Sequence, residues 1–236
     1  MDSLLKQVNQ DLKFTAYKTL AHSVDDGMLE FIPGCKTVQD ILKDNEKGGI
    51  RAYLQAKAGK DEEKFAEYYN NYLKSCAGYA VVTYFLAVGD RHLENLLIDE
   101  TGHLFHVDFG FIFGKNPPFK NTAQPPIRIC LEMMEALGGP KSKDYSEFLE
   151  TCVQCFAYLR KYRNHIINMV YLMIHAGIPD IQADYQKVLN DLNQKFMPLK
   201  NQQEASEDFR KVVKESVNAF FPKVLDTIHV WATYMK

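Results

Sequence analysis

Two short polar groups near the middle of the chain contain residue types suited to metal binding and proton transfer. Asp90, His92 and Asn95 occur in the sequence Gly-Asp-Arg-His-Leu-Glu-Asn, and Asp108 follows Asn95 by 13 residues, in Asp-Phe-Gly. A carboxylate and an amide carbonyl are the hard oxygen ligands that Mg²⁺ takes, usually together with substrate phosphates. The imidazole of His92 exchanges a proton near neutral pH, as a general base for a hydroxyl nucleophile must. The pattern predicts a magnesium site beside a general base.

The residues between these two groups predict the element that brings them together. Asn-Leu-Leu-Ile (95–98) and His-Leu-Phe-His-Val (103–107) are typical of strands, and Asp-Glu-Thr-Gly between them is typical of a turn. Because a hairpin brings its two ends together, we expect Asn95 and Asp108 to reach one metal ion. His103 and His106 share this segment, but without further ligands nearby they favour packing or surface positions.

The flanking sequence predicts a small strand-bearing portion followed by a large helical body. Short strands are expected at 13–20 and 28–32, after a short helical lead-in, and Thr37 is a candidate helix N-cap. A long helix is expected over 61–88, polar at its start and apolar at its end. Further helices are expected at 130–137, 145–162, 163–176, 181–196 and 206–234, the last broken or kinked at Pro222. The expected fold class is α+β and mainly α.

Composition bounds the function classes. The chain has 236 residues, 28 Lys and Arg against 30 Asp and Glu, and a formal net charge of −2. This balance argues against a nucleic-acid binder acting through bulk positive charge. The first residues lack the apolar core of a signal peptide, and the uncharged run 77–89 is too short to span a bilayer. The five cysteines, including Cys152 and Cys155 in a C-x-x-C, favour buried thiols over a zinc site. We therefore expect a cytoplasmic protein.

The order of these motifs resembles a known family. Gly-Asp-Arg-His-x-x-Asn followed by a hairpin and His-Val-Asp-Phe-Gly is similar to the active-site sequence of the phosphatidylinositol 3- and 4-kinases and their large protein-kinase relatives. Within that family the chain most resembles the class III phosphatidylinositol 3-kinases, from about Leu4 to its last residue. The resemblance implies a protein-kinase-like fold, with a remnant of the N-terminal lobe and the hinge at 1–34. It implies a helical C-terminal lobe at 35–236, with the catalytic loop, the activation loop and a terminal amphipathic helix.

The resemblance also implies roles for individual residues. His92 would act as base or proton relay for the inositol 3-hydroxyl, Asp90 and Arg91 would hold the catalytic loop, and Asp108 would bind Mg²⁺ with help from Asn95. For the adenine of ATP it implies the hinge residues Glu30, Phe31 and Ile32, with Leu97 and Val107 as apolar floor and wall. Lys115 and Lys120 would meet the phosphoinositide head group. Segment 108–128 has three basic residues, these two and Arg128, against the single acid Asp108.

The same resemblance implies ATP and Mg²⁺ as cofactors, phosphatidylinositol in membranes and a regulatory protein subunit as partners, and no nucleic acid. It implies a peripheral place on endosomal or other intracellular membranes. Before Glu30 the chain has neither a Gly-rich phosphate loop nor a lysine in a matching strand context, so we expect it to begin partway through the N-terminal lobe and to bind ATP weakly. The alternatives are a serine/threonine protein kinase of the related branch, or an impaired fragment that acts as a binding module.

Overall fold

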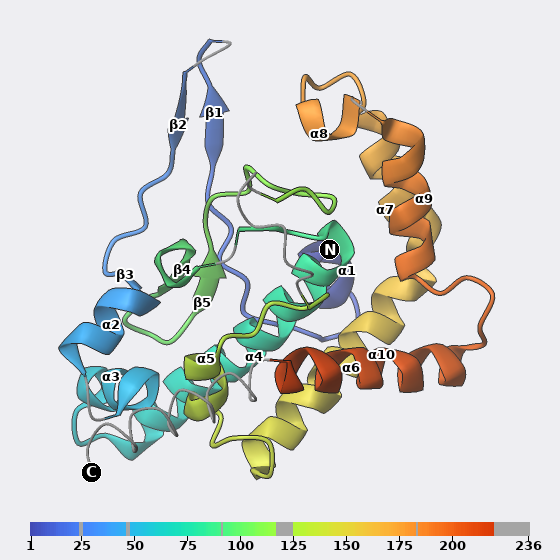
Figure 1. Ribbon diagram of the computed structural model, residues 1–236. Helices are drawn as coiled ribbons and strands as arrows, with labels where there is room; N and C mark the ends of the chain where they lie inside the picture. Colours follow the sequence, from blue (N-terminus) through green and yellow to red (C-terminus); the bar gives the residue numbers. More distant parts are fainter. Residues whose placement is uncertain (24–25, 46–47, 91, 117–124, 183, 220–236) are drawn as a thin grey trace, which may run out of the picture.

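A computed structural model describes residues 1–23, 26–45, 48–90, 92–116, 125–182 and 184–219. In this part of the chain helices dominate and strands are short, which confirms the expected class, α+β and mainly α (Figure 1). The helices are α1 (Asp2–Lys6), α2 (Val38–Asp44), α3 (Gly49–Ala58), α4 (Glu62–Leu86), α5 (Leu131–Ala136), α6 (Lys143–Lys161), α7 (Arg163–Leu172), α8 (Pro179–Gln182), α9 (Tyr185–Lys195) and α10 (Gln202–Asn218). The strands are β1 (Thr19–Ala21), β2 (Gly27–Leu29), β3 (Lys36–Thr37), β4 (Leu96–Ile98) and β5 (Leu104–His106).

Helix α4 runs through the centre of the molecule, as its sequence predicts (Figure 1). It begins at its N-cap Asp61, whose side chain accepts a hydrogen bond from the backbone N–H of Lys64. Its first half is largely exposed, and its second half is buried almost continuously. Helix α6 packs across it, and α10 packs on α6. The apolar second half of α4 therefore lies inside the core and ends directly before the segment predicted to be the catalytic loop.

The expected hairpin is present as strands β4 and β5, which pair antiparallel with Leu97 opposite Phe105. Strand β3 adds to the other side of β4, so that β4 is the central strand of this three-stranded sheet. Side chains alternate between the two faces of a strand. Leu97, Phe105 and Val107 consequently share one face, while Leu104 and His106 lie on the face toward α4.

The outer edge of β5 is hydrogen-bonded to side chains. The buried hydroxyl of Ser75, on α4, accepts a hydrogen bond from the Leu104 N–H at 2.9 Å. The Tyr17 hydroxyl donates to the His106 carbonyl at 3.3 Å, and the His106 ring stacks on that of Tyr79 at 4.9 Å. Edge strands carry backbone groups that need partners. Side chains supply them here and fix the hairpin against α4.

The N-terminal residues differ from the expectation in one respect. Strands were expected at 13–20 and 28–32, but the hairpin of β1 and β2 is limited to Thr19–Ala21 and Gly27–Leu29. Lys13 has a φ of +54°, which no strand can accommodate. Phe14 and Tyr17 turn toward α4 and β5, where their rings meet Tyr79 and Phe105.

The helical body also differs from the expectation at several ends. The helix expected at 181–196 is two helices, α8 and α9, because Asp184 caps a new helix by accepting a hydrogen bond from the Lys187 N–H. Helix α7 ends at Leu172 rather than at 176. Thr37 is an N-cap as expected, accepting from the Asp40 N–H. Of the segment expected to be helical at 206–234, α10 occupies the part up to Asn218, and Pro222 lies outside the described residues.

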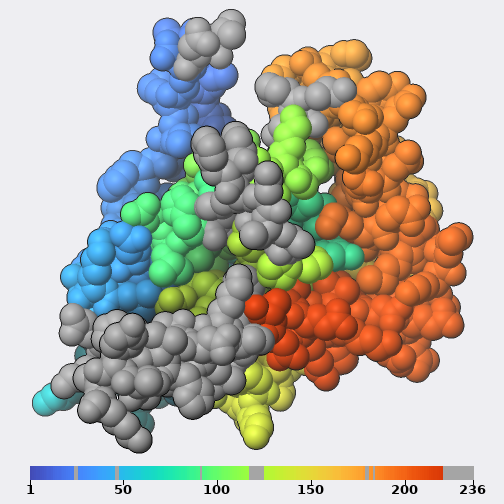
Figure 2. Space-filling view, in the orientation of Figure 1, coloured from blue at the N-terminus to red at the C-terminus, as the bar shows by residue number. Residues whose placement is uncertain are grey.

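The described part of the chain shares one hydrophobic core. Leu5 and Leu12 are buried in the same cluster as the residues of α4 and α6, while the β1–β2 hairpin projects away from the body (Figures 1 and 2). The division of the chain at residues 34 and 35 stays a prediction. Cys152 and Cys155 are buried free thiols, and the described residues contain no group of three metal-ligating side chains. No described helix is long and apolar enough to cross a membrane.

Candidate active site

The hairpin brings the two predicted metal ligands onto neighbouring backbone segments. The Val107 N–H donates to the Asn95 carbonyl at 3.1 Å, which places Asp108 one residue beyond a residue bonded to Asn95. Asn95 is buried, with 8% of its surface exposed, at the end of a short 3-10 helix (Leu93–Asn95). Its amide nitrogen donates to the Asp90 carbonyl at 3.1 Å, so the amide oxygen is the atom left for a metal ion.

Both predicted carboxylates of the site have an unusual backbone conformation. Asp90 has a φ of +46° and Asp108 a φ of +57°, in the left-handed region. For a residue with a side chain this conformation costs roughly 1–2 kcal/mol. In return the exposed Asp108 side chain is held by its own turn, since its Oδ1 accepts a hydrogen bond from the Gly110 N–H at 3.0 Å. The two acids are therefore positioned at the expense of folding stability.

Backbone hydrogen bonds join the end of α4 to the segment after Asp108. Gly89 N–H donates to Phe111 O at 2.8 Å, Phe113 N–H to Leu86 O at 2.7 Å, and Gly114 N–H to Ala87 O at 3.0 Å. A methyl group on Gly89 would lie 2.3 Å from the carbonyl oxygen of Lys115, closer than real contacts permit. The close approach of these segments therefore requires glycine at position 89, and it fixes the start of the catalytic loop relative to Asp108.

His92 lies in the predicted catalytic loop, between the two acids in sequence, and 41% of its side chain is exposed. Its Nδ1 is 3.8 Å from Oε2 of Glu94, and Oε1 of that carboxylate accepts a hydrogen bond from Gln39 at 2.9 Å. Glu94 is thus tied to α2 and can restrain the imidazole. A half-exposed imidazole can both meet a substrate hydroxyl and pass its proton to water.

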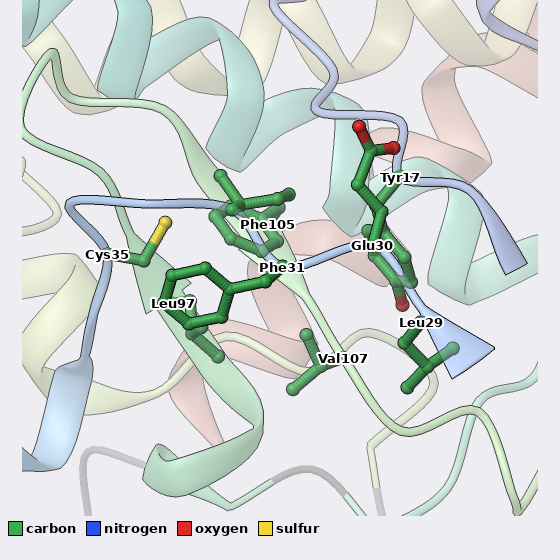
Figure 3. Close-up of a pocket in the computed structure, with 9 residues that line it drawn as sticks. Tyr17, Leu29, Glu30, Phe31, Cys35, Leu97, Phe105 and Val107 are labelled. Atoms are coloured by element: carbon green, nitrogen blue, oxygen red, sulfur yellow. The ribbon is translucent and has the colours of Figure 1, made fainter.

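All five residues predicted to contact adenine line one pocket, of about 210 Å³. Figure 3 shows Leu97 and Val107 from the hairpin facing Phe31 and its neighbours. The Glu30 carboxylate turns away from the pocket and accepts a hydrogen bond from the Lys18 N–H. Glu30 therefore contributes its backbone, as was expected of the hinge. That these residues contact a nucleotide stays a prediction.

The pocket also contains residues that the sequence analysis did not select. They are Tyr17, Leu29, Cys35 and Phe105. Phe105 could have been found, because it pairs directly with Leu97 and must share its face. Tyr17 and Cys35 reach the pocket through tertiary contacts, for which the sequence has no local signal. Burial raises the pKa of the Cys35 thiol to about 11, with Asp99 and Glu100 adding to the effect.

The polar edge of this pocket has unused backbone groups. The N–H and C=O of Ile32 make no hydrogen bond to any other residue in the described part of the chain. Two adjacent donor and acceptor groups at the rim of an apolar slot can bind the edge of a planar heterocycle.

The other predicted site residues lie outside this pocket. Arg91 and Lys120 lie outside the described residues, and Lys115 is exposed beside Gly114.

Comparison with known proteins places this site in a family. Residues 1–183 match the family described as phosphatidylinositol 3- and 4-kinase. The whole chain is 45% identical to a phosphatidylinositol 3-kinase, nodule isoform, of Glycine max. It is 43% identical to phosphatidylinositol 3-kinase VPS34 of Arabidopsis thaliana and 38% identical to that of Saccharomyces cerevisiae. The alignments cover 100% of this chain but 29%, 29% and 27% of these relatives, so the chain spans less than a third of their length.

Proposed function

The chain belongs to the phosphatidylinositol 3- and 4-kinase family, and from that membership we propose that it is the catalytic portion of a phosphatidylinositol 3-kinase. The proposed reaction is transfer of the γ-phosphoryl group of ATP to the 3-hydroxyl of phosphatidylinositol. The relatives named above are phosphatidylinositol 3-kinases. The observation that supports the proposal most directly is the hydrogen bond between Val107 and Asn95, which brings Asn95 and Asp108 together beside the apolar pocket.

ATP would bind with its adenine in the pocket. Leu97, Val107 and Phe105 offer an apolar face from the hairpin, and Ile32 offers backbone groups for the polar edge. The phosphates would then extend toward Asn95, two residues before Leu97, and Asp108, one residue after Val107. Kinase family membership implies the use of ATP. These particular contacts are part of the proposal.

The residues present fit a magnesium ion. Asn95 presents its amide oxygen, because its amide nitrogen is bonded to Asp90, and Asp108 presents a carboxylate held by the Gly110 N–H. Both are hard oxygen donors, and two protein ligands are usual where phosphates complete the shell. When bound, Mg²⁺ would neutralise charge on the transferring phosphoryl group. The positions of both side chains are set by hydrogen bonds that already exist without the ion.

His92 would remove the proton from the attacking 3-hydroxyl. The half-exposed imidazole is restrained near Glu94 and lies two residues from Asp90. Removing a general base typically costs 10²–10⁴-fold in rate. Lys115, with Lys120, would meet the anionic head group. A regulatory protein subunit and a peripheral place on endosomal membranes complete the proposal, in line with what the sequence resemblance implies.

The test is a kinase assay on a chain extended at its N-terminus to include a phosphate loop and its lysine. Vesicles of phosphatidylinositol and a protein substrate are offered side by side with MgATP. We expect lipid phosphorylation, a loss of about 10²–10⁴-fold in His92→Ala, and no measurable activity in Asp108→Ala. His165→Ala, an exposed histidine on α7, is the matched control and should retain activity within about twofold.

Two results would contradict the proposal. Phosphorylation of the protein but not of the lipid would assign the chain to the protein-kinase branch of the family. Near-normal lipid phosphorylation in either His92→Ala or Asp108→Ala would remove the roles given to these residues.

A further inference from the structure

A second small pocket borders the start of the catalytic loop. It has a volume of about 210 Å³ and lies where the end of α4 meets the two segments that flank residues 117–124. Its lining includes Gly89, Gly114, Asn116 and Arg128, together with Lys195 from the end of α9. None of its described lining residues is acidic. The pocket shares no residue with the one that the proposed function assigns to adenine.

Lys195 is held in place within this pocket. It is the last residue of α9, and the Tyr84 hydroxyl donates to its carbonyl at 3.1 Å. Its ammonium nitrogen lies 4.4 Å from the centre of the Tyr84 ring, a distance at which a cation is attracted to an aromatic face. Burial lowers the pKa of this ammonium, opposed by Asp191 one turn earlier on the helix. The charge is thus fixed in position and partly removed from water.

Arg128 is the second cation of the pocket. Its guanidinium is partly buried, which lowers its pKa, and Asp90 of the catalytic loop opposes that shift from a distance. Among the described residues, Asp90 acts on Arg128 and Asp191 acts on Lys195 electrostatically, and Lys195 meets the Tyr84 ring, but no hydrogen bond or ion pair joins either charged group to another residue. Charges withdrawn from water are costly unless a partner of opposite sign is present. A pocket that contains two such charges and no acid is suited to an anion.

Phosphate matches this arrangement better than other common anions. A phosphate group has up to two negative charges and at least two free oxygens, and it accepts paired hydrogen bonds from a guanidinium together with a point contact from an ammonium. Asn116 adds a side-chain amide. Gly89 is three residues from His92, so their Cα atoms lie no more than about 11 Å apart. The pocket therefore borders the same loop as the proposed base.

We propose that Arg128 and Lys195 form a phosphate-binding subsite at the start of the catalytic loop. Two sources provide the same chemistry: the phosphate that links inositol to the rest of the lipid, and free inorganic phosphate. Binding of phosphate here does not depend on the chain being a kinase. The use of the subsite to orient the lipid head group does rest on the proposed function.

The test is titration calorimetry of the chain at constant ionic strength, with inorganic phosphate and with inositol 1-phosphate as separate probes. The double variant Arg128→Gln/Lys195→Gln should bind both at least tenfold more weakly. The matched control Arg163→Gln/Lys187→Gln makes the same change in charge on α7 and α9, outside the pocket, and should bind within twofold of the original chain. Lys195→Met is a second variant that keeps its aliphatic stem on the Tyr84 ring, so a folding defect in the double variant leaves the test intact.

The comparison between the probes identifies the source. Tenfold tighter binding of inositol 1-phosphate supports the subsite and assigns it to the lipid head group, whereas equal binding supports it and assigns it to free phosphate. Absence of binding by both probes, or unchanged affinity in both Lys195→Met and the double variant, overturns the inference. If the extended chain binds phosphate through these residues but phosphorylates no lipid, the proposed function fails while the subsite stands.

Discussion

Ser75 connects the central helix to the hairpin that positions the site, and its removal should be costly. Its hydroxyl is fully buried and accepts the Leu104 N–H at 2.9 Å, on the edge of β5 that none of the described strands covers. In Ser75→Ala that N–H remains buried without a partner. An unsatisfied buried donor costs about 1–3 kcal/mol. The same hydroxyl donates to carbonyls of its own helix, which keep their helical bonds, so this second loss adds little.

The measurement is urea unfolding followed by circular dichroism at 222 nm. We expect the free energy of unfolding to fall by about 1–3 kcal/mol with an unchanged m-value, since the surface exposed on unfolding is the same. In thermal unfolding a chain of this size loses about 2–4 °C for each kcal/mol. The Leu104 amide should also exchange its hydrogen faster than its neighbours in β5, because its partner is lost.

Thr83→Val is the matched control. Thr83 is buried one turn from the end of the same helix, and its hydroxyl donates only to carbonyls of that helix. Its replacement removes a hydroxyl without leaving a donor unpaired, and should change the stability by less than about 1 kcal/mol. A loss in Ser75→Ala no larger than that in Thr83→Val would refute the role given to this hydrogen bond.

Three further predictions concern the surroundings of the site. Gly89→Ala should destabilise the chain by about 1–3 kcal/mol in urea unfolding, because the new methyl would overlap the Lys115 carbonyl. A loss below about 1 kcal/mol would contradict this. Burial raises the pKa of Asp99, but hydrogen bonds from His103 and Thr101 outweigh it, so the folded pKa lies below the usual value near 3.9. Asp99 therefore adds stability above about pH 4 that is lost as the pH falls through the folded pKa. Asp99→Asn should flatten the stability profile below about pH 4; an equally steep profile in the variant would argue against it. Cys35 has a pKa of about 11, so its rate of reaction with iodoacetamide should rise about tenfold for each pH unit between 8 and 10. MgATP bound in the pocket should slow this reaction. A rate that is level above pH 9, or that nucleotide leaves unchanged, would count against the pocket assignment.

The sequence was sufficient to predict the elements that carry the site. Helix α4 and the β4–β5 hairpin follow from local periodicity and turn residues, and the proximity of Asn95 and Asp108 follows from the hairpin. The contribution of Cys35 and Tyr17 to the pocket does not follow, since both reach it by contacts between distant segments. Strand β3 is missed for the same reason: its two residues gain their conformation from pairing with β4.

Two other differences arise from competition between local and tertiary preferences. Residues 13–18 have residue types typical of a strand. Phe14 and Tyr17 instead pack against Tyr79 of α4 and Phe105 of β5, and the positive φ of Lys13 turns the chain before them. The start of α9 was missed although the sequence contains its signal. Asp184 precedes the helix and caps it, so attention to capping residues inside a long helical pattern would have divided 181–196 correctly.

The hydrogen bonds that hold the segment after Asp108 against the end of α4 join backbone atoms alone. The bonds themselves do not depend on the side chains of Leu86 or Phe111, whereas Ala87 and Phe113 have a left-handed backbone conformation and Gly89 is constrained by space. Amino-acid changes around this framework can accumulate over evolutionary time without altering the spacing between the catalytic loop and Asp108.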